Sequence, residues 1–147
     1  DADPRLAAHA VAVGLREDVD LDGGFDGALT AARDRGAALI AAHPYALGDL
    51  GTTSRTTARW AEEPEWAANA VDRFELCNRH DFFAWVARAR LPVVANGDFH
   101  GPEHLATWKT LVPAEKSEEA VVDYLRSRRP VSLAFFEPPV QLIARAA

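Results

Sequence analysis

Short apolar runs alternate along this chain with longer stretches in which apolar and polar residues are mixed. Three of the runs have the length and apolar character of single strands, and they cover residues 8–15, 37–42 and 91–96; a fourth strand is expected over 71–77. The stretch 25–35 instead places apolar residues at helical spacing, and Gly36 follows as a stop signal. Repeated strand–helix–strand order predicts an α/β fold with a parallel-stranded sheet, since parallel strands need crossover connections.

The rest of the pattern predicts further elements of the same kinds. Helices are expected over 58–70 with a break at Pro64, over 81–90, over 117–128 with Ser117 as the cap, and over 138–147; strands are expected over 107–112 and 131–136; a loop over the site is expected at 45–57. No internal repeat or interdomain linker interrupts the chain, so residues 1–147 are expected to form a single domain.

Composition narrows the class of protein. Of 147 residues, 48% are apolar, which is enough for a core, and the net charge of −6 argues against a broad nucleic-acid-binding surface. Cys77 is the only cysteine, so it cannot form an internal disulfide, and a buried small hydrophobe is expected there rather than a nucleophile. No run reaches the length of a membrane helix and no signal peptide is visible, so the cytoplasm is the expected compartment and no membrane partner is expected.

The candidate chemistry begins at Asn96-Gly97-Asp98-Phe99-His100, which follows the apolar run at residues 91–95. Parallel sheets and barrels place their chemistry where strands end, and a carboxylate and an imidazole two residues apart can converge on one divalent cation. The alternative is an ordinary turn in which Asp98 caps backbone amides and His100 faces solvent. Taken alone, the motif favours neither interpretation.

Two further histidines favour a shared metal site. His43 follows the apolar run at residues 36–42, and Pro44 ends that strand. His9 lies near the start of another strand. A lone histidine in an apolar segment is more often a hydrogen-bonded core residue than a ligand. Two strand-end motifs with ligand-type side chains are nevertheless better explained by one common cleft.

These segments together resemble a known family. Ala41-Ala42-His43-Pro44, Phe74-Glu75-Leu76-Cys77-Asn78 and Asn96-Gly97-Asp98-Phe99-His100 occur in the order of the AHP, E-x-x-N and (S/G)-D-x-H signatures of the PHP (polymerase and histidinol phosphatase) family of metal-dependent phosphoesterases. His9 ahead of Val13-Gly14-Leu15 resembles that family's H-x-x-G-L strand. The resemblance runs from about His9 to Leu133. It implies part of a distorted (β/α)7 barrel and metal-dependent hydrolysis of phosphate esters, with nucleotides and oligonucleotides among the candidate substrates.

The departure from the family is equally informative. The family begins with an H-x-H strand and a bridging glutamate, whereas no H-x-H occurs here and the chain opens on Asp1 with no methionine. The chain is therefore expected to be the C-terminal part of a PHP domain whose N-terminal part is absent. The resemblance implies up to three manganese, zinc or iron ions, with His9 and His43 on one, Asp98 on a second and His100 on a third. No ion would receive more than two ligands from this chain, so the chain alone is expected to be inactive.

Other side chains are candidates for contact with a small phosphorylated substrate. Arg79 has a guanidinium fork that matches phosphate oxygens, although an ordinary solvated arginine is an equal alternative. Asn78 is a candidate for hydrogen bonding to substrate, and Glu75 is expected to support the site from behind. His104 is more often a surface residue in such a position, but it lies close enough in sequence to reach the leaving group.

Two functions remain open from the sequence. The first is a hydrolase in which Asp98 and His100 take part in catalysis. The second is a catalytically incomplete PHP-like module that binds a phosphorylated ligand or a protein partner. An amidohydrolase-type barrel has less support, because no candidate for a carboxylated lysine sits at a strand end.

Overall fold

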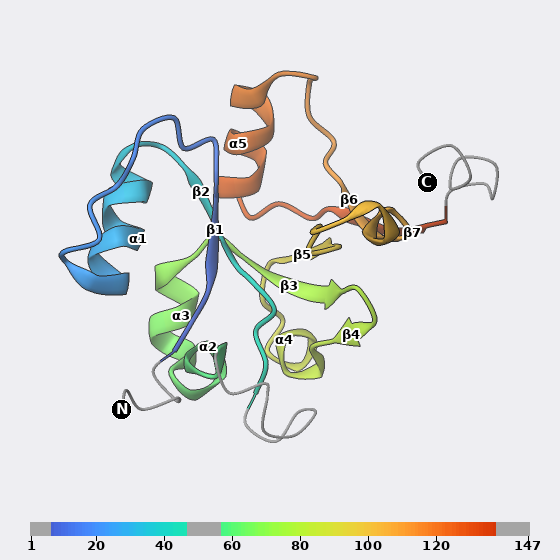
Figure 1. Ribbon diagram of the computed structural model, residues 1–147, viewed down its shortest axis with the longest axis horizontal. Coiled ribbons are helices and arrows are strands. Elements are labelled where there is room, and N and C mark those ends of the chain that lie inside the picture. Colours follow the sequence, from blue (N-terminus) through green and yellow to red (C-terminus); the bar gives the residue numbers. More distant parts are fainter. Residues whose placement is uncertain (1–6, 47–56, 138–147) are drawn as a thin grey trace.

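A computed structural model describes residues 7–46 and 57–137, and it shows a mixed α/β protein (Figure 1). Its described part contains a five-stranded sheet, helices on both faces of that sheet, and a separate two-stranded ribbon. The helix expected over 138–147 and most of the loop expected at 45–57 lie outside the described residues. Within the described residues the sheet is open.

The sheet has parallel strands at its centre, as the alternating pattern predicts. Strands β2 (Ala38–Ala41) and β5 (Val93–Asn96) both pair in parallel with β3 (Arg73–Asn78). The short strand β4 (Asp81–Phe82) folds back antiparallel to the end of β3. Because β2, β3 and β5 point the same way, the residues that follow them lie at one edge of the sheet.

The prediction that the first strand is also parallel is wrong. Strand β1 (Ala10–Val13) pairs antiparallel with β2, with Ala10 opposite Ala41 and Val13 opposite Ala38. Figure 1 shows the reason: after β1 the chain runs back along the sheet as an irregular segment, and helix α1 (Gly24–Asp34) then returns in the opposite direction. The chain therefore enters β2 beside the point where it leaves β1, and the two strands run in opposite directions.

Both faces of β2 are buried, which explains its uninterrupted apolar sequence. Leu39 and Ala41 pack on one face against a core that includes Leu29 and Trp60. Helices α1, α2 (Arg59–Glu62), α3 (Pro64–Ala70) and α4 (Ala84–Arg88) contribute to this core. On the other face, Ala38 and Ile40 pack against helix α5 (Glu118–Arg126).

Local signals account for most element boundaries. Pro64 separates α2 from α3 and occupies the first turn of α3, where its missing N–H costs nothing. Ser117 caps α5, since its hydroxyl accepts from the backbone N–H of Ala120 at 3.2 Å. The helix expected from Asp81 begins only at Ala84, because residues 81 and 82 pair with β3 instead.

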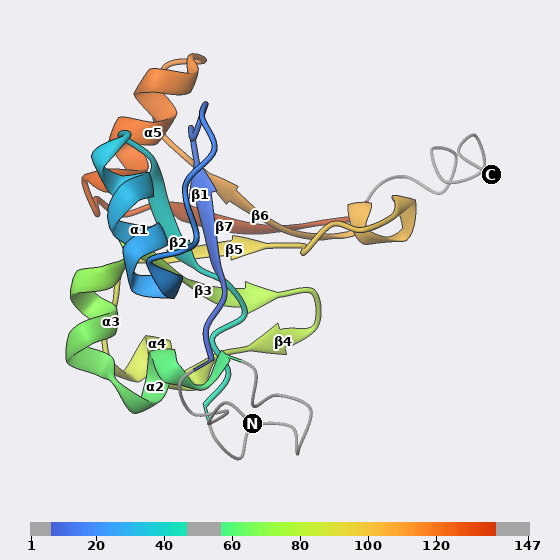
Figure 2. The same cartoon turned by 60° about the vertical axis from the view of Figure 1, so that its left-hand side comes forward.

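The last two strands form a ribbon of their own. Strands β6 (Thr107–Leu111) and β7 (Ser132–Phe136) pair antiparallel, so the parallel pattern does not extend to them. The hydroxyl of Thr110 joins the ribbon to β5, accepting from the backbone N–H of Ala95 and donating to its carbonyl, both at 2.8 Å. Figure 2 shows the ribbon beside β5, with the 3₁₀ helix η3 (Pro102–Leu105) at its far end. None of the described helices is both long and apolar enough to cross a membrane.

Candidate functional site

Side chains from four separate stretches of the chain meet at one edge of the sheet. Parallel strands β2, β3 and β5 all end at this edge, and antiparallel β1 begins there. The stretches contribute His9, His43, the end of β3 at Glu75 to Asn78, and the loop from Asn96 to His100. The reversed direction of β1, which overturned one fold prediction, is therefore what brings His9 to the site.

His9 and His43 form a close pair. The backbone N–H of Ala42 donates to the carbonyl of His9 at 3.0 Å, and this holds the two strands in register. Nδ1 of His9 then lies 3.3 Å from Nε2 of His43, with the rings nearly perpendicular at 85°. Partial burial and the neighbouring His43 lower the pKa of His9, while Asp98 acts in the opposite direction. The charge of Asp98 thus reaches His9 from the loop after β5.

The spacing of the two imidazoles fits two kinds of contact. One is a direct hydrogen bond, in which one ring donates and the other accepts. The other is a shared cation, because two nitrogens that each lie about 2.0–2.1 Å from a tetrahedral zinc ion are about 3.3–3.4 Å apart. The observed separation of 3.3 Å is compatible with both. The donor set at this point therefore fits a divalent cation of the kind that histidine prefers.

The carboxylate of Glu75 connects three of the stretches that form the site. Only 3% of the residue is exposed, and its carboxylate accepts three hydrogen bonds. Oε2 accepts from the backbone N–H of His43 at 2.6 Å and from Nδ2 of Asn78 at 2.7 Å, while Oε1 accepts from Nδ2 of Asn96 at 2.9 Å. One buried carboxylate thereby ties together the ends of β2, β3 and β5. This is the supporting role expected for Glu75, and it places Asn78 (4% exposed) in the interior rather than at the surface.

A bulge in β3 makes this network possible. Glu75 lies opposite Val94 and Cys77 opposite Ala95, so Leu76 is an extra residue without a partner on β5. In a regular strand, residues three apart point to opposite faces of the sheet. The bulge reverses this alternation and lets the side chains of Glu75 and Asn78 meet.

Arg79 holds the loop that carries Asp98 and His100. Its Nη2 donates to the backbone carbonyl of Asp98 at 2.7 Å and forms an ion pair with Oδ2 of the same residue at 3.1 Å. Nη2 also lies 3.0 Å from Nδ1 of His100, and Oδ1 of Asp98 lies 3.5 Å from that same Nδ1. The structure therefore brings Arg79, Asp98 and His100 together, and the guanidinium of Arg79 binds the loop that carries the other two residues.

The backbone at this edge adopts an uncommon conformation three times. His43, Arg79 and Asp98 have φ angles of +30°, +51° and +44°. Such angles cost side-chain-bearing residues on the order of 1–3 kcal/mol each and persist only where the surroundings impose them. The hydrogen bonds from His43 to Glu75 and from Arg79 to the loop supply that constraint. Strain gathered at one edge is a common feature of functional sites.

His104 is connected to His100. It lies on η3, and its Nδ1 accepts a hydrogen bond from the backbone N–H of His100 at 2.9 Å. A neutral His104 therefore carries its proton on Nε2. The candidate substrate contact of the sequence analysis thus lies beside the loop, on the side of the ribbon.

Two further residues with structural roles, Tyr45 at the site and Arg73 away from it, were not among the sequence candidates. Tyr45 follows the His43-Pro44 pair at the end of β2. Its hydroxyl donates to Oδ2 of Asp81 in β4, so this hydrogen bond joins the end of β2 to the β3–β4 hairpin. Burial, and then this carboxylate, raise the pKa of Tyr45 well above its usual range. An aromatic residue directly after a strand-end histidine was the available signal, and its partner 36 residues away was not visible in the sequence.

Arg73 was overlooked for a different reason. It lies within β3 and is 1% exposed, and its guanidinium donates to the carbonyls of Tyr124, Leu125 and Arg129 at 3.1, 2.8 and 2.7 Å. It therefore satisfies carbonyls at the C-terminus of α5, where a positive charge also complements the helix dipole. Burial lowers its pKa. An arginine within an expected strand gave no indication of a helix 50 residues further along.

The histidine and acidic side chains of the described residues do not form a complete metal centre by themselves. In residues 7–46 and 57–137 there is no group of three or more His, Cys, Asp or Glu side chains placed to hold a metal ion. The pair His9–His43 and the pair Asp98–His100 are adjacent partial sets at the same edge.

Comparison with known proteins adds no family assignment: no protein-family model and no curated protein sequence matches the chain. The resemblance to the PHP family therefore rests on the motifs and their spacing.

Proposed function

We propose that this chain is the C-terminal part of a PHP-type barrel that hydrolyses phosphate esters with the help of divalent metal ions. The observation that supports the proposal is that two pairs of candidate ligands, His9–His43 and Asp98–His100, lie at the same edge of the sheet and come from three parts of the chain. These are the residues that the motifs single out, and their donor atoms suit zinc, manganese or iron.

The residues of this chain divide the work among them. His9 and His43 supply neutral nitrogen ligands, and Asp98 supplies the negative charge that a cation requires. Bound here, a divalent cation lowers the pKa of water and offsets negative charge on a phosphate ester. Glu75 keeps His43 and the loop after β5 in place through its three hydrogen bonds.

Arg79 is the proposed contact for phosphate. Its guanidinium already lies among Asp98 and His100, and its side chain is 37% exposed, so an anion at this edge can reach it. Two oxygens of a phosphate group can accept a pair of parallel N–H bonds from a guanidinium, as the two oxygens of a carboxylate can. Substrate would then compete with Asp98 for Arg79 and leave that carboxylate available to a cation.

Two observations favour the second candidate, a non-catalytic module that binds a phosphorylated ligand or a protein partner. Asp98 is already neutralised by Arg79, and the ligands of the described residues come in pairs rather than triads. A protein that kept the Arg79 loop and no longer bound metal would retain an anion-binding edge without hydrolysis.

The test uses the complete gene product. Metal content is measured by elemental analysis after dialysis, and hydrolysis is screened with a panel of phosphomonoesters and phosphodiesters. Asp98→Asn should abolish turnover and leave the fold intact, because the amide keeps the shape of the side chain and loses its charge. Asp34→Asn, an exposed change at the end of α1, is the matched control and should leave turnover unchanged.

Two further outcomes separate the candidates. Glu75→Gln should reduce turnover by about 10–100-fold, as is typical of residues that orient metal ligands. A protein without metal and without hydrolysis, which still binds phosphate through Arg79, would establish the non-catalytic module. Robust metal-dependent hydrolysis by residues 1–147 alone would show that another constellation in this chain carries the chemistry.

A further inference from the structure

One short segment of the chain binds the backbone of both histidines in the His9–His43 pair. Thr57 precedes helix α2 and Trp60 lies within it, and both residues are completely buried. The hydroxyl of Thr57 donates to the carbonyl of His43 at 2.7 Å, and Nε1 of Trp60 donates to the carbonyl of His9 at 3.1 Å. The segment 57–60 therefore joins the start of β1 to the end of β2 at the candidate site.

The backbone of His43 is held at both of its polar groups. Its N–H donates to the buried carboxylate of Glu75 at 2.6 Å, and its carbonyl accepts from Thr57. The same hydroxyl of Thr57 accepts from the backbone N–H of Tyr45 at 3.3 Å, so it closes the turn that follows the histidine. His43 has a φ angle of +30°, which a residue with a side chain keeps only where its surroundings impose it. Thr57 is part of those surroundings.

The backbone of His9 is held in a similar way. Its carbonyl accepts two hydrogen bonds, one from the backbone N–H of Ala42 at 3.0 Å and one from the indole of Trp60. That indole is itself fixed by the core, because it stacks on Trp66 with ring centroids 5.1 Å apart and meets Phe74 edge to face at 6.2 Å. The packing of α2 and α3 thereby reaches the carbonyl of His9.

These contacts bear on the two imidazoles. The rotamers open to a side chain depend on the φ and ψ angles of its backbone. The separation of 3.3 Å between Nδ1 of His9 and Nε2 of His43 therefore depends on how both backbones are held. Partners that orient ligands in this indirect way commonly change metal affinity when they are removed.

We propose that Thr57 and Trp60 are positioning residues, which hold the carbonyls of His43 and His9 so that the two imidazoles can bind one cation. The inference rests on the proposed function for the cation alone. The contact between the two rings in the metal-free protein tests the positioning without it.

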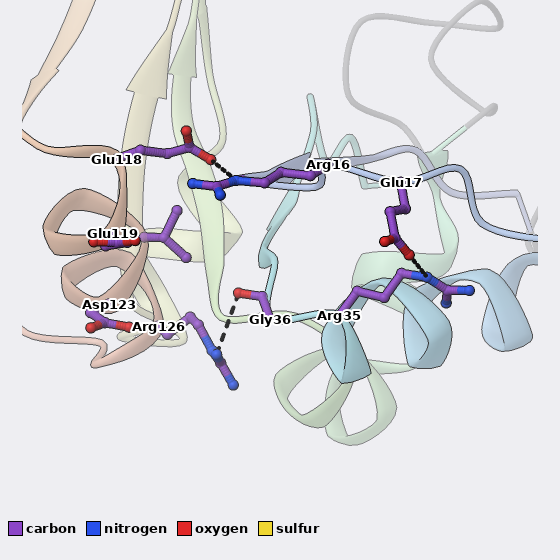
Figure 3. Close-up of a pocket in the computed structure, with 10 residues that line it drawn as sticks. Arg16, Glu17, Arg35, Gly36, Glu118, Glu119, Asp123 and Arg126 are labelled. Carbon is purple, nitrogen blue, oxygen red and sulfur yellow. Dashed lines mark hydrogen bonds and ion pairs between the residues drawn. The ribbon is translucent and has the colours of Figure 1, made fainter.

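A control position lies at the opposite edge of the sheet. There, α5 and the segments that follow β1 and α1 enclose a pocket of about 540 Å³ (Figure 3). Its charged side chains pair with one another, Arg16 with Glu118 at 3.2 Å and Arg35 with Glu17 at 3.8 Å. Val122 lines this pocket and is 8% exposed, so Val122→Ala should destabilise the protein far from the histidines.

The first measurement uses the complete gene product, isotope-labelled and stripped of metal. Nuclear Overhauser effects between the ring protons of His9 and His43 report their contact, since the ring centroids lie 4.9 Å apart. Thr57→Val and Trp60→Phe each remove one donor, and each should abolish or strongly weaken these signals. Thr57→Ser keeps the hydroxyl and should retain them. Val122→Ala should retain them as well, although its thermal midpoint falls.

The second measurement is calorimetric titration of the same metal-free proteins with zinc. Thr57→Val and Trp60→Phe should each weaken zinc binding by about 10–100-fold, the usual effect of removing a group that orients a ligand. Thr57→Ser and Val122→Ala should bind zinc as the wild type does. The serine variant separates loss of the hydroxyl from loss of the methyl group, and the alanine variant separates positioning from general loss of stability.

The outcomes separate this inference from the proposed function. Ring contacts that are unchanged in Thr57→Val and Trp60→Phe would overturn the positioning role, even in an active phosphoesterase. An equal loss of the ring contacts in Val122→Ala would overturn it as well, because any destabilisation would then have the same effect. A wild-type protein that binds no zinc would contradict the proposed function, and the ring contacts would then decide the positioning role by themselves.

Discussion

Nδ1 of His9 lies 3.3 Å from Nε2 of His43, although 34 residues separate the two histidines. Their strands pair antiparallel, so the start of β1 meets the end of β2. Asp98 influences the same pair from the loop after β5, because its negative charge acts on the pKa of His9. The candidate site is thus an electrostatically coupled unit of three chain segments.

This coupling predicts opposite shifts in the pKa of His9. Its pKa lies below the ordinary value of 6.5, owing to partial burial and then to His43. His43→Ala removes some of the burial of His9 and the electrostatic effect of the neighbouring imidazole, both of which lower the pKa of His9, so this pKa should rise. Asp98→Asn removes a negative charge that raises the pKa of His9, so in this variant the pKa of His9 should fall. NMR titration of the imidazole signals measures both, and a change in the same direction in both variants would contradict the coupling.

Glu75 should be far more important for stability than other glutamates. Glu75→Ala leaves the donors of His43, Asn78 and Asn96 without their acceptor in a buried site, and it should lower the free energy of unfolding by on the order of 2–4 kcal/mol. Urea denaturation measures the loss. Glu62→Ala, at an exposed position of α2, should change it by less than about 0.5 kcal/mol. Equal effects would mean that the buried network contributes little.

Replacing Gly97 with alanine should destabilise the protein through a clash with the methyl group of Thr107, and removing that methyl group should relieve the clash. A Cβ at residue 97 would lie 2.1 Å from Cγ2 of Thr107, so Gly97→Ala should destabilise the protein by about 1–3 kcal/mol. Thr107→Ser deletes that methyl group, and the nearest remaining atoms lie at 3.1 and 3.2 Å. A double-mutant cycle should show that most of the cost disappears in the serine background. Additive effects would place the strain elsewhere.

The buried thiol of Cys77 should make the free energy of unfolding decrease as the pH rises above about 9. Burial raises its pKa above the 9.0 of an exposed thiol, so above pH 9 the unfolded chain loses this proton before the folded protein does. The corresponding stability is complete below pH 9 and declines as the pH rises through the folded pKa. The urea midpoint should therefore fall more between pH 8 and pH 10 in the wild type than in Cys77→Ala. Equal declines would show that the thiol is not protected.

The sequence alone determined most of the elements and the candidate residues. The sequence identified β2, β3 and β5 as strands, and β2 has the continuous apolar run that a strand buried on both faces needs. Pro64 and Ser117 marked helix boundaries correctly, since missing donors and capping hydroxyls act within a few residues. The strand-end positions of His43 and Asp98 followed from the same local logic.

Only the tertiary structure decided how these pieces meet. The direction of β1 depends on the irregular segment before α1, whose path no periodicity encodes. The bulge at Leu76, the three bonds of Glu75 and the reach of Arg73 to α5 each join residues distant in sequence or reverse a local rule. Local patterns record the preferences of neighbouring residues, whereas these contacts depend on packing between segments, and that packing assembles the site.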